Sequence, residues 1–310
     1  MRSGSRTMDR SRLVLGTVQL GMDYGLNNTS GRPTKDVAFA ILDTALQHGI
    51  NTFDTAFAYG MAEDVLGEWI EGRGIQNEVL VISKMKPHAL NDYPDGTPIA
   101  DIVFTEIEKS LKRLRLEKLD GYLLHTPSYV YLKHVVAGLE AAKAKGLVSH
   151  IGVSTYDEAE ALQTAELGLD YVQVPLNALD QRIEKTDFWK IVERNGITVF
   201  ARSPFLQGLL VMEPGRIPAH LSFARSYVET FRAIADRYGM TPAQAALLYS
   251  YSHAKAHHVV FGVETEEQLN DNLRIVEEER NNDDLVREIE NSFRTIERAV
   301  VNPSLWSTIK

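Results

Sequence analysis

Four side chains that can donate, accept or stabilise a proton lie at or next to the ends of three consecutive predicted strands. Asp54 and Tyr59 belong to the stretch 51–69, in which a short apolar strand leads through a polar and aromatic loop into a helix. Lys84 and His125 end the next two predicted strands along the chain. Because the carboxyl ends of parallel strands meet at one edge of a sheet, we expect the four side chains to lie close together.

Together these four groups have the chemistry needed to reduce a carbonyl. A phenol with its ordinary pKa of ~10 is a poor acid or base at neutral pH, and a neighbouring ammonium would lower that pKa. We therefore expect Lys84 to lower the pKa of Tyr59, with Asp54 holding the ammonium in its charged form. A neutral His125 would donate a hydrogen bond to the substrate oxygen. Taken singly, the same residues have structural interpretations: a strand-end cap, a packed ring, a surface lysine and a hydrogen-bonded histidine.

The rest of the chain predicts the elements that carry these residues. Short runs rich in Val, Ile, Leu and Phe alternate with helical patterns, which is the signature of repeated βα units. The predicted strands are 13–20, 50–54, 79–84, 120–125, 149–153, 171–175, 197–202 and 258–262. The predicted helices are 35–48, 62–72, 99–116, 133–146, 156–167, 185–195, 222–239 and 265–278, with 283–299 as an extra helix.

Several helix boundaries carry their own signals. Thr34, and Thr241 followed by Pro242, have the residue types of helix N-caps. Four glycines end predicted helices just before predicted strands, as expected of left-handed C-caps: Gly49, Gly146, Gly168 and Gly196.

This pattern predicts an α/β fold, a (β/α)₈ TIM barrel with an extra C-terminal helix. Nearly continuous apolar strands are typical of parallel sheets buried on both faces, and eight of them favour a barrel over a doubly wound sheet. We expect one domain spanning residues 1–310 rather than two. Its basic, polar leader at 1–11 and its tail at 300–310 are expected to be frayed.

Composition narrows the classes of partner. The 310 residues are 44% hydrophobic and 24% charged, with a formal net charge of −9 and no cysteine. An acidic chain without a basic cluster is a poor candidate for binding nucleic acid or an anionic membrane. It shows neither a signal-peptide core nor an apolar run near the ~18 residues needed to span a bilayer, so a cytoplasmic location is expected. Adjacent His257 and His258 would point to opposite faces of a strand, so no metal site is predicted.

The chain resembles the aldo-keto reductase family over about residues 12 to 280. The motifs that carry the resemblance are LGTVQLG at 15–21, FDTAFAYG at 53–60, VISK at 81–84, LLHTP at 123–127, IGVS at 151–154, VQVPLN at 172–177, RSPFLQGLL at 202–210 and FGVETEEQLNDN at 261–272. The family's catalytic tetrad then falls on Asp54, Tyr59, Lys84 and His125. This agrees with the roles that their chemistry suggests.

The same resemblance implies a nicotinamide cofactor across the mouth of the barrel. Ser154 and Gln173 match positions that bind the carboxamide, and Arg202 matches the position that offers a planar group to the nicotinamide face. The remaining cofactor positions are Gly16, Thr17, Ser203, Leu206, Gln207, Gly208, Gly262, Glu264, Gln268 and Asn272. A Rossmann site is not indicated, because the chain has no GxGxxG motif.

Two departures from the family pattern bear on the cofactor. Thr155 stands where many relatives have Asn, next to a carboxamide contact. Gly262, Glu264 and Gln268 stand where basic residues often bind the 2′-phosphate. An acidic group suits a free ribose 2′-hydroxyl, so NADH is a second option beside NADPH, the family's usual cofactor and our first expectation.

The substrate is expected to be a small carbonyl compound. Tyr24 is the predicted substrate contact, in a polar lining expected from loops 21–34 and 85–98 that also contains Asn27, Asn28, Asn91, Asp92 and Tyr93. Such a lining suits a hydroxylated or sugar-like carbonyl. The C-terminal Trp306 has two interpretations, as part of a mobile tail or as a residue that reaches toward the substrate.

Two other functional classes compete with a reductase. The family includes channel-associated members, so the chain could be a cofactor-binding regulatory or scaffold subunit without catalysis. A metal-dependent barrel hydrolase lacks ligands in this sequence. The intact tetrad favours an NAD(P)H-dependent oxidoreductase that reduces an aldehyde or ketone, while the oligomeric state is left open.

Overall fold

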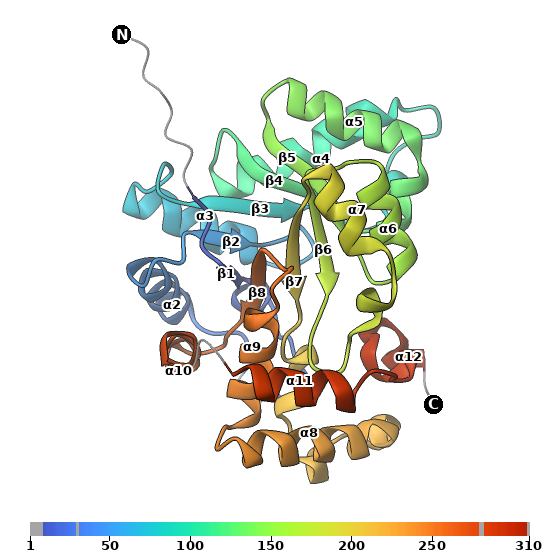
Figure 1. The fold of residues 1–310 in the computed structure, drawn as a ribbon. Helices are drawn as coiled ribbons and strands as arrows, with labels where there is room; N and C mark the ends of the chain where they lie inside the picture. Colours follow the sequence, from blue (N-terminus) through green and yellow to red (C-terminus); the bar gives the residue numbers. More distant parts are fainter. Residues whose placement is uncertain (1–8, 29–30, 279–281, 309–310) are drawn as a thin grey trace.

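The computed structural model describes residues 9–28, 31–278 and 282–308, and within them eight parallel strands close into a barrel in chain order (Figure 1). The strands are β1 (Leu13–Gly16), β2 (Thr52–Asp54), β3 (Leu80–Lys84), β4 (Leu119–Leu124), β5 (Val148–Ser154), β6 (Tyr171–Pro175), β7 (Thr198–Arg202) and β8 (His258–Gly262). The predicted (β/α)₈ architecture is therefore confirmed.

Helices surround the barrel (Figure 1). They are α1 (Val18–Gly21), α2 (Lys35–Gln47), α3 (Ala62–Arg73), α4 (Ile99–Leu114), α5 (Lys133–Ala144), α6 (Glu158–Glu166), α7 (Phe188–Asn195), α8 (Arg225–Arg237), α9 (Pro242–Ser252), α10 (Glu266–Glu278), α11 (Asp283–Ser292) and α12 (Arg298–Val301). Helices α8 and α11 lie below the barrel in the view of Figure 1.

The predicted helix boundaries hold where local capping signals mark them. The Thr34 side chain accepts a hydrogen bond from the backbone N–H of Val37, and Thr241 forms a reciprocal capping box with Gln244. The four glycines expected to end helices all have left-handed φ values, between 65° and 80°: Gly49, Gly146, Gly168 and Gly196.

Two predicted elements end earlier than expected, and one helix was not predicted. The strand predicted at 13–20 ends at Gly16, because the Thr17 N–H bonds the Asp54 carbonyl and the chain then turns into α1. Helix α9 was not among the predicted helices, although the Thr241 cap was. The helix predicted at 283–299 stops at Ser292, because Phe293 turns inward and is buried.

The barrel interior is filled by side chains and is not a channel. Val14, Ile82, Leu123, Tyr171 and Phe200 form the cluster inside the strands, as expected for a barrel of eight strands. A much larger cluster lies between the strands and the helices that surround them. The barrel is therefore a rigid support for side chains at its rim.

The two ends of the described chain are bound to the rest of the molecule. Arg10 donates two hydrogen bonds to Asp120, of 3.0 and 2.7 Å, on the side of the barrel opposite the carboxyl ends of the strands. Val300, Val301 and Trp306 belong to the apolar cluster around α8, α9 and α11. Residues 9–11 and 300–306, for which fraying was expected, are thus in contact with the rest of the molecule, while 1–8 and 309–310 lie outside the described residues.

The first and last strands complete the barrel. Strand β1 pairs with β8 from Leu13 opposite Val259 to Gly16 opposite Gly262. Just before β1, the Arg12 carbonyl accepts a hydrogen bond from the Val259 N–H. The Arg12 guanidinium donates to the carbonyls of Tyr251, His253 and Ala256. This seam, the pairing of β1 with β8, joins the first strand of the barrel to the last.

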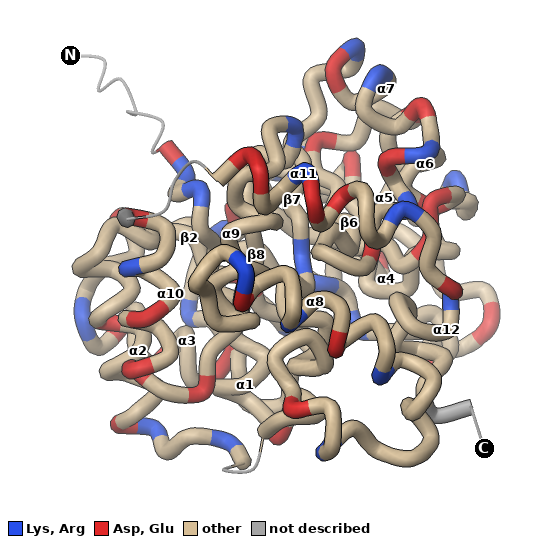
Figure 2. Tube along the Cα trace, turned by 60° about the horizontal axis from the view of Figure 1, so that its bottom comes forward, with Lys and Arg blue, Asp and Glu red and all other residues tan. Residues whose placement is uncertain are grey.

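Charged residues of both signs are distributed over the surface. In the view of Figure 2, α8 carries charges of both signs, whereas α10 and α11 carry mainly acidic residues. Among the helices of the described residues, none has both the length and the apolar character required to cross a membrane.

Candidate active site

Strands β2, β3 and β4 place the four proton-transfer candidates at one rim of the barrel. Asp54 is the last residue of β2 and Lys84 the last residue of β3, while His125 follows β4 directly. The register sets Asp54 beside Ile82 and Lys84 beside Leu123. Tyr59 lies on the loop between β2 and α3. The structure therefore brings together the four residues that the sequence singled out.

Close packing fixes the loop that carries Tyr59. Gly21 lies so near this loop that a Cβ atom there would overlap the Tyr59 carbonyl oxygen and the Ala62 N–H. Gly60 has a left-handed φ of 58°, and its carbonyl accepts a hydrogen bond from Arg113. Gly21, Gly60 and Arg113 thus fix the backbone of the loop that carries the Tyr59 side chain.

Lys84 and Asp54 form a buried ion pair beneath the pocket. Their side chains are 1% and 3% exposed. The Lys84 Nζ atom donates to Asp54 Oδ1 at 2.6 Å, to the Thr55 carbonyl at 2.9 Å and to the Tyr59 oxygen at 3.4 Å. Burial lowers the pKa of Lys84, and the contact with Asp54 opposes that effect. The ammonium is thereby held within reach of the phenol.

Tyr59 and His125 face each other above this pair. Their rings lie edge to face, with centroids 5.6 Å apart. Burial first, then the charges of Lys84 and Arg202, lowers the pKa of His125 to about 3, so the imidazole is neutral at physiological pH. A neutral His125 was the expectation from its chemistry.

The expected lowering of the Tyr59 pKa does not occur. Burial raises the pKa of Tyr59, and the nearby Asp54 carboxylate raises it further. The physical reason is that burial disfavours the charged phenolate, and the positive charge of Arg202 offsets this effect only in part. Tyr59 is therefore protonated at neutral pH and is a proton donor in its resting form.

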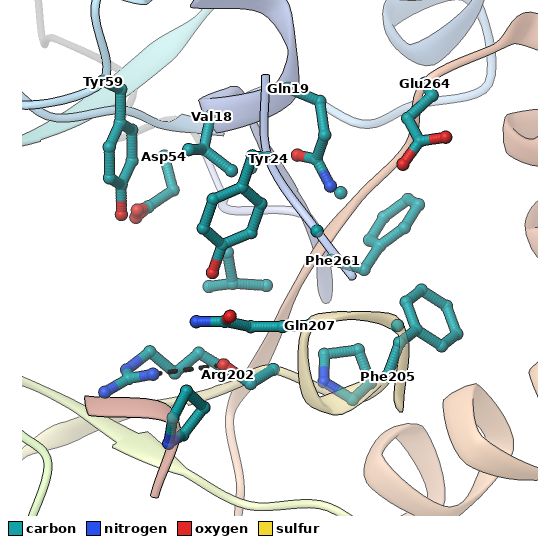
Figure 3. A pocket seen from close by; sticks show the side chains of 18 of the residues that line it. Val18, Gln19, Tyr24, Asp54, Tyr59, Arg202, Phe205, Gln207, Phe261 and Glu264 are labelled. Carbon is teal, nitrogen blue, oxygen red and sulfur yellow. Dashed lines mark hydrogen bonds between the residues drawn. The ribbon is translucent and has the colours of Figure 1, made fainter. Parts of the chain in front are cut away.

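A pocket of about 590 Å³ opens beside these residues (Figure 3). Three of the tetrad line it, namely Asp54, Tyr59 and His125. So do the predicted residues Gly16, Tyr24, Ser154, Gln173, Arg202, Ser203, Gln207, Gly208, Gly262, Glu264, Gln268 and Asn272. The other three predicted residues, Thr17, Lys84 and Leu206, are buried behind the pocket wall.

A chain of hydrogen bonds connects the pocket wall to the ion pair. The Ser154 hydroxyl donates to Gln173 Oε1 at 3.0 Å, and Gln173 Nε2 donates to Asp54 Oδ1 at 2.8 Å. Because the Asp54 carboxylate accepts only, its position selects the orientation of the Gln173 amide. The two residues expected to bind a carboxamide thus also support Asp54.

The Arg202 guanidinium, at the end of β7, is fixed by two hydrogen bonds and a contact with an aromatic ring. Its Nη2 donates to the Thr155 carbonyl at 2.6 Å and its Nη1 to the Ser203 hydroxyl at 3.1 Å, the contact drawn as a dashed line in Figure 3. The guanidinium carbon lies 4.9 Å from the centroid of the Tyr156 ring. Arg202 therefore presents a fixed planar cation to the pocket.

The segment after β7 adopts an uncommon backbone. Ser203, Leu206 and Gln207 have φ values of 63°, 46° and 54°, in the left-handed region that non-glycine residues rarely occupy. Backbone strain of this kind concentrates at ligand clamps and active sites. The Gln207 carbonyl also accepts a hydrogen bond of 2.8 Å from the Leu26 N–H, which joins this segment to the loop after β1.

Sequence reasoning missed a large part of the pocket lining. The missed residues come from α1 and the loop after it, from the segments after β2, β5 and β7, from α9, β8 and α10, and from the C-terminal segment: Val18, Gln19, Met22, Gly25, Ala58, Tyr156, Pro204, Phe205, Val211, Ala243, Val260, Phe261, Asp271, Pro303 and Ser304. Of these, Val18 and Gln19 lie in the LGTVQLG motif, which was a usable signal. Pro303 and Ser304 had no comparable signal.

The expected substrate lining from 85–98 is wrong. Asp92 pairs with Lys86, and the Tyr93 hydroxyl donates to Glu106 at 2.7 Å, so this loop folds back on α4. Tyr24 and Asn27 do line the pocket. Trp306 does not, because its ring is buried and its Nε1 donates to the Ala299 carbonyl. The C-terminal segment reaches the pocket through Pro303 and Ser304 instead.

The pocket has polar groups ready for a ligand. Three buried polar atoms on its lining have no hydrogen-bond partner, namely Gln19 Oε1, His125 Nδ1 and Arg202 Nε. Buried polar groups in proteins are normally paired, so these atoms fit a ligand rich in amide, hydroxyl and phosphate groups. A nicotinamide dinucleotide has this chemistry. Within the described residues, no group of three His, Asp or Glu side chains is arranged to hold a metal ion.

Comparison with known proteins agrees with this geometry. The model of the Aldo/keto reductase family matches residues 12–292. The uncharacterized oxidoreductase YqkF of Bacillus subtilis is 24% identical over 301 residues, which cover 89% of this chain and 92% of that protein. Aflatoxin B1 aldehyde reductase member 2 of Rattus norvegicus is 26% identical over 312 residues, covering 87% and 81%.

A solved structure from Pseudomonas aeruginosa, assigned to the aldo-keto reductases, superposes with a TM-score of 0.64. The two chains are 20% identical, and the match covers 89% of this chain and 93% of the other. Similarity at this level of identity shows a shared fold.

Proposed function

Since the chain belongs to the aldo/keto reductase family and is thus an oxidoreductase of that family, we propose that it reduces an aldehyde or ketone to an alcohol with NAD(P)H, using Tyr59 as the proton donor. The observation that carries the proposal is the set of contacts around Tyr59. Its oxygen lies 3.4 Å from the buried Lys84 ammonium and its ring faces the neutral His125, both beside the pocket.

The residues of this site divide the work of reduction. A reduced nicotinamide dinucleotide, when bound, supplies the hydride to the carbonyl carbon. Tyr59 donates its proton to the carbonyl oxygen, and the Lys84 ammonium stabilises the phenolate that remains. His125 donates a hydrogen bond to the same oxygen as negative charge develops there. Asp54 keeps Lys84 charged and in place.

The dinucleotide would be held by residues along the length of the pocket. Ser154 and Gln173 suit a carboxamide, because the hydroxyl and the amide can both donate and accept. The guanidinium of Arg202 offers a flat face. Gln207 and Gly208 lie on the strained segment, where the backbone approaches the pocket closely.

The side chains nearest Tyr59 favour a substrate with an apolar or aromatic body beside its carbonyl. Val18, Met22 and Ala58 line the pocket there, with the rings of Tyr24 and Tyr156. Because the loop 85–98 lies elsewhere, the polar lining expected for a sugar-like substrate is much reduced. A panel that contains an aromatic aldehyde, an aliphatic aldehyde and an aldose should rank them in that order of kcat/KM.

Replacement of the phenol tests the proposal. Tyr59→Phe should reduce turnover of an aromatic aldehyde by at least ~10²-fold, the lower end for general acid catalysis. The dissociation constant of the reduced dinucleotide, measured by quenching of protein fluorescence, should change by less than about threefold, because the lost hydroxyl faces the substrate oxygen.

Tyr93→Phe is the matched control, since it removes a phenolic hydroxyl that bonds Glu106 outside the pocket. It should keep parental turnover. A Tyr59→Phe enzyme with more than a tenth of parental turnover would refute the role of Tyr59. Tight dinucleotide binding without turnover of any aldehyde by the parent would point to the regulatory subunit instead.

A further inference from the structure

The end of the pocket away from Tyr59 is built from the chain around β8 and α10. Glu264 points into the pocket there, on the far side of Gln19 and Tyr24 from Tyr59 (Figure 3). Gln268, Asp271 and Asn272 complete this end, and their spacing of three and four residues puts them on one face of α10. We call these four residues, Glu264, Gln268, Asp271 and Asn272, the distal set.

The distal set carries negative charge. Glu264 and Asp271 are both acidic, and among the described residues that line the pocket Arg202 alone is basic. Arg202 lies at the other end, bonded to Thr155 and Ser203. Asp271 pairs with Arg274, but both side chains are 59% exposed, so this surface pair is strongly screened by solvent. Glu264 has no ion-pair partner among the described residues.

Glu264 is also held in place. Its backbone N–H donates to Gln268 Oε1 at 2.8 Å, and its side chain is half-buried. The Glu264 carboxylate lies near Gly25, where an added Cβ would come within 3.8 Å of its oxygen. The loop after β1 thus lies beside the carboxylate on the pocket side.

The position of the proton donor fixes which part of a dinucleotide meets the distal set. Hydride transfer requires the nicotinamide to lie beside Tyr59. The adenosine half of the same molecule must then lie toward the other end of the pocket, where Glu264 and α10 are. The ribose of that half is the only part at which NADH and NADPH differ.

We propose that this protein uses NADH in preference to NADPH, with Glu264 as the main specificity-determining residue. The inference rests on the proposed function. A carboxylate accepts hydrogen bonds from the ribose 2′-hydroxyl, as acidic residues do in other dinucleotide sites. A 2′-phosphate has no donor for the carboxylate and carries like charge, which would be repelled at a site that is partly removed from water. Asp271 adds to this repulsion.

Direct binding measurements test the proposal without relying on turnover. Dissociation constants for NADH and NADPH are measured by quenching of protein fluorescence at fixed ionic strength. The titrations are done at pH 8, because burial raises the pKa of Glu264 and its charge must be present. The parent should bind NADH at least tenfold more tightly. Glu264→Gln should reduce the ratio of the NADPH to the NADH dissociation constant by at least threefold. Glu264→Arg should bring this ratio below one, so that NADPH binds more tightly.

Glu267→Arg is the matched control. It makes the same change of charge three residues away, at an exposed position outside the pocket. The NADH to NADPH ratio of this variant should stay within twofold of the parental ratio, since the exposed charge is screened by salt. Circular dichroism spectra of all variants, matched to the parent, establish that each is folded.

The possible outcomes separate this inference from the proposed function. Tighter binding of NADPH by the parent would overturn the NADH preference while leaving carbonyl reduction intact. If Glu264→Gln and Glu264→Arg leave the ratio of the NADH and NADPH dissociation constants unchanged, the role of Glu264 is likewise overturned. If the parent binds neither dinucleotide, the proposed function fails and the preference fails with it.

Discussion

Replacing Lys84 with Met should destabilise the protein strongly, in addition to removing its activity. Met fills a similar volume but leaves the Asp54 carboxylate, which is 3% exposed, without a cation. Gln173 Nε2 would still donate to Asp54 Oδ1, and this one neutral hydrogen bond does not balance a buried charge. Removal of one partner of a buried ion pair typically costs ~3–5 kcal/mol. We expect the free energy of unfolding to fall by about this amount.

Urea unfolding at pH 7, followed by tryptophan fluorescence, measures the change. The matched control is Lys86→Met, because Lys86 pairs with Asp92 at the surface, where the two side chains are 39% and 42% exposed. Exposed pairs contribute ~0–1 kcal/mol. The same substitution two residues away should therefore have little effect on the unfolding midpoint.

A double variant separates loss of the cation from loss of packing. Asp54→Asn in the Lys84→Met background removes the unpaired charge and keeps a side-chain oxygen that can accept from Gln173. We expect it to recover at least half of the lost stability while staying inactive. Equal stabilities of Lys84→Met and Lys86→Met would refute the reasoning. So would a double variant no more stable than Lys84→Met alone.

Two further measurements test other parts of the site. The pKa of His125 is lowered to about 3 from 6.5, so between these values the unfolded chain binds one more proton and stability falls as the pH falls. Between pH 7 and pH 5 the wild type should lose about 2 kcal/mol more unfolding free energy than His125→Gln, and equal losses would contradict the low pKa. Gly21→Ala should lower kcat at least tenfold, because its Cβ would displace the loop that carries Tyr59. In Gly72→Ala the added Cβ meets nothing within 4 Å, so kcat should be unchanged and α3 should gain ~0.5–1 kcal/mol; comparable kcat values for the two variants would show that the loop is tolerant.

The parts of this protein that the sequence predicts are those governed by local patterns. Apolar runs and glycine stops located all eight strands, and the strand ends located Asp54, Lys84 and His125. The sequence did not reveal that burial and the Asp54 carboxylate would raise the pKa of Tyr59. That outcome depends on burial and on distances between residues of different strands, which no local pattern encodes.

The pocket wall was predicted less well, for a related reason. Loop 85–98 has the polar composition of a binding loop, yet it bonds to α4 through Tyr93 and Glu106. Pro303 and Ser304 lie in a tail that looked frayed, but apolar contacts of Val300, Val301 and Trp306 hold that tail against the molecule. The position of such a loop or tail is determined by its contacts with residues distant in sequence. Composition alone does not contain that information.

The seam between β1 and β8 has a consequence for how the enzyme is made. All four residues of the proposed proton-transfer site lie between residues 54 and 125, and they are translated well before β8. The strand that must pair with Leu13–Gly16 ends only at Gly262, and contacts between segments so distant in sequence form late and slowly. Until then β1 has an unpaired edge, which favours contacts with other chains. The nascent chain thus carries its chemical groups long before it has a pocket, and we expect it to depend on chaperones during that interval.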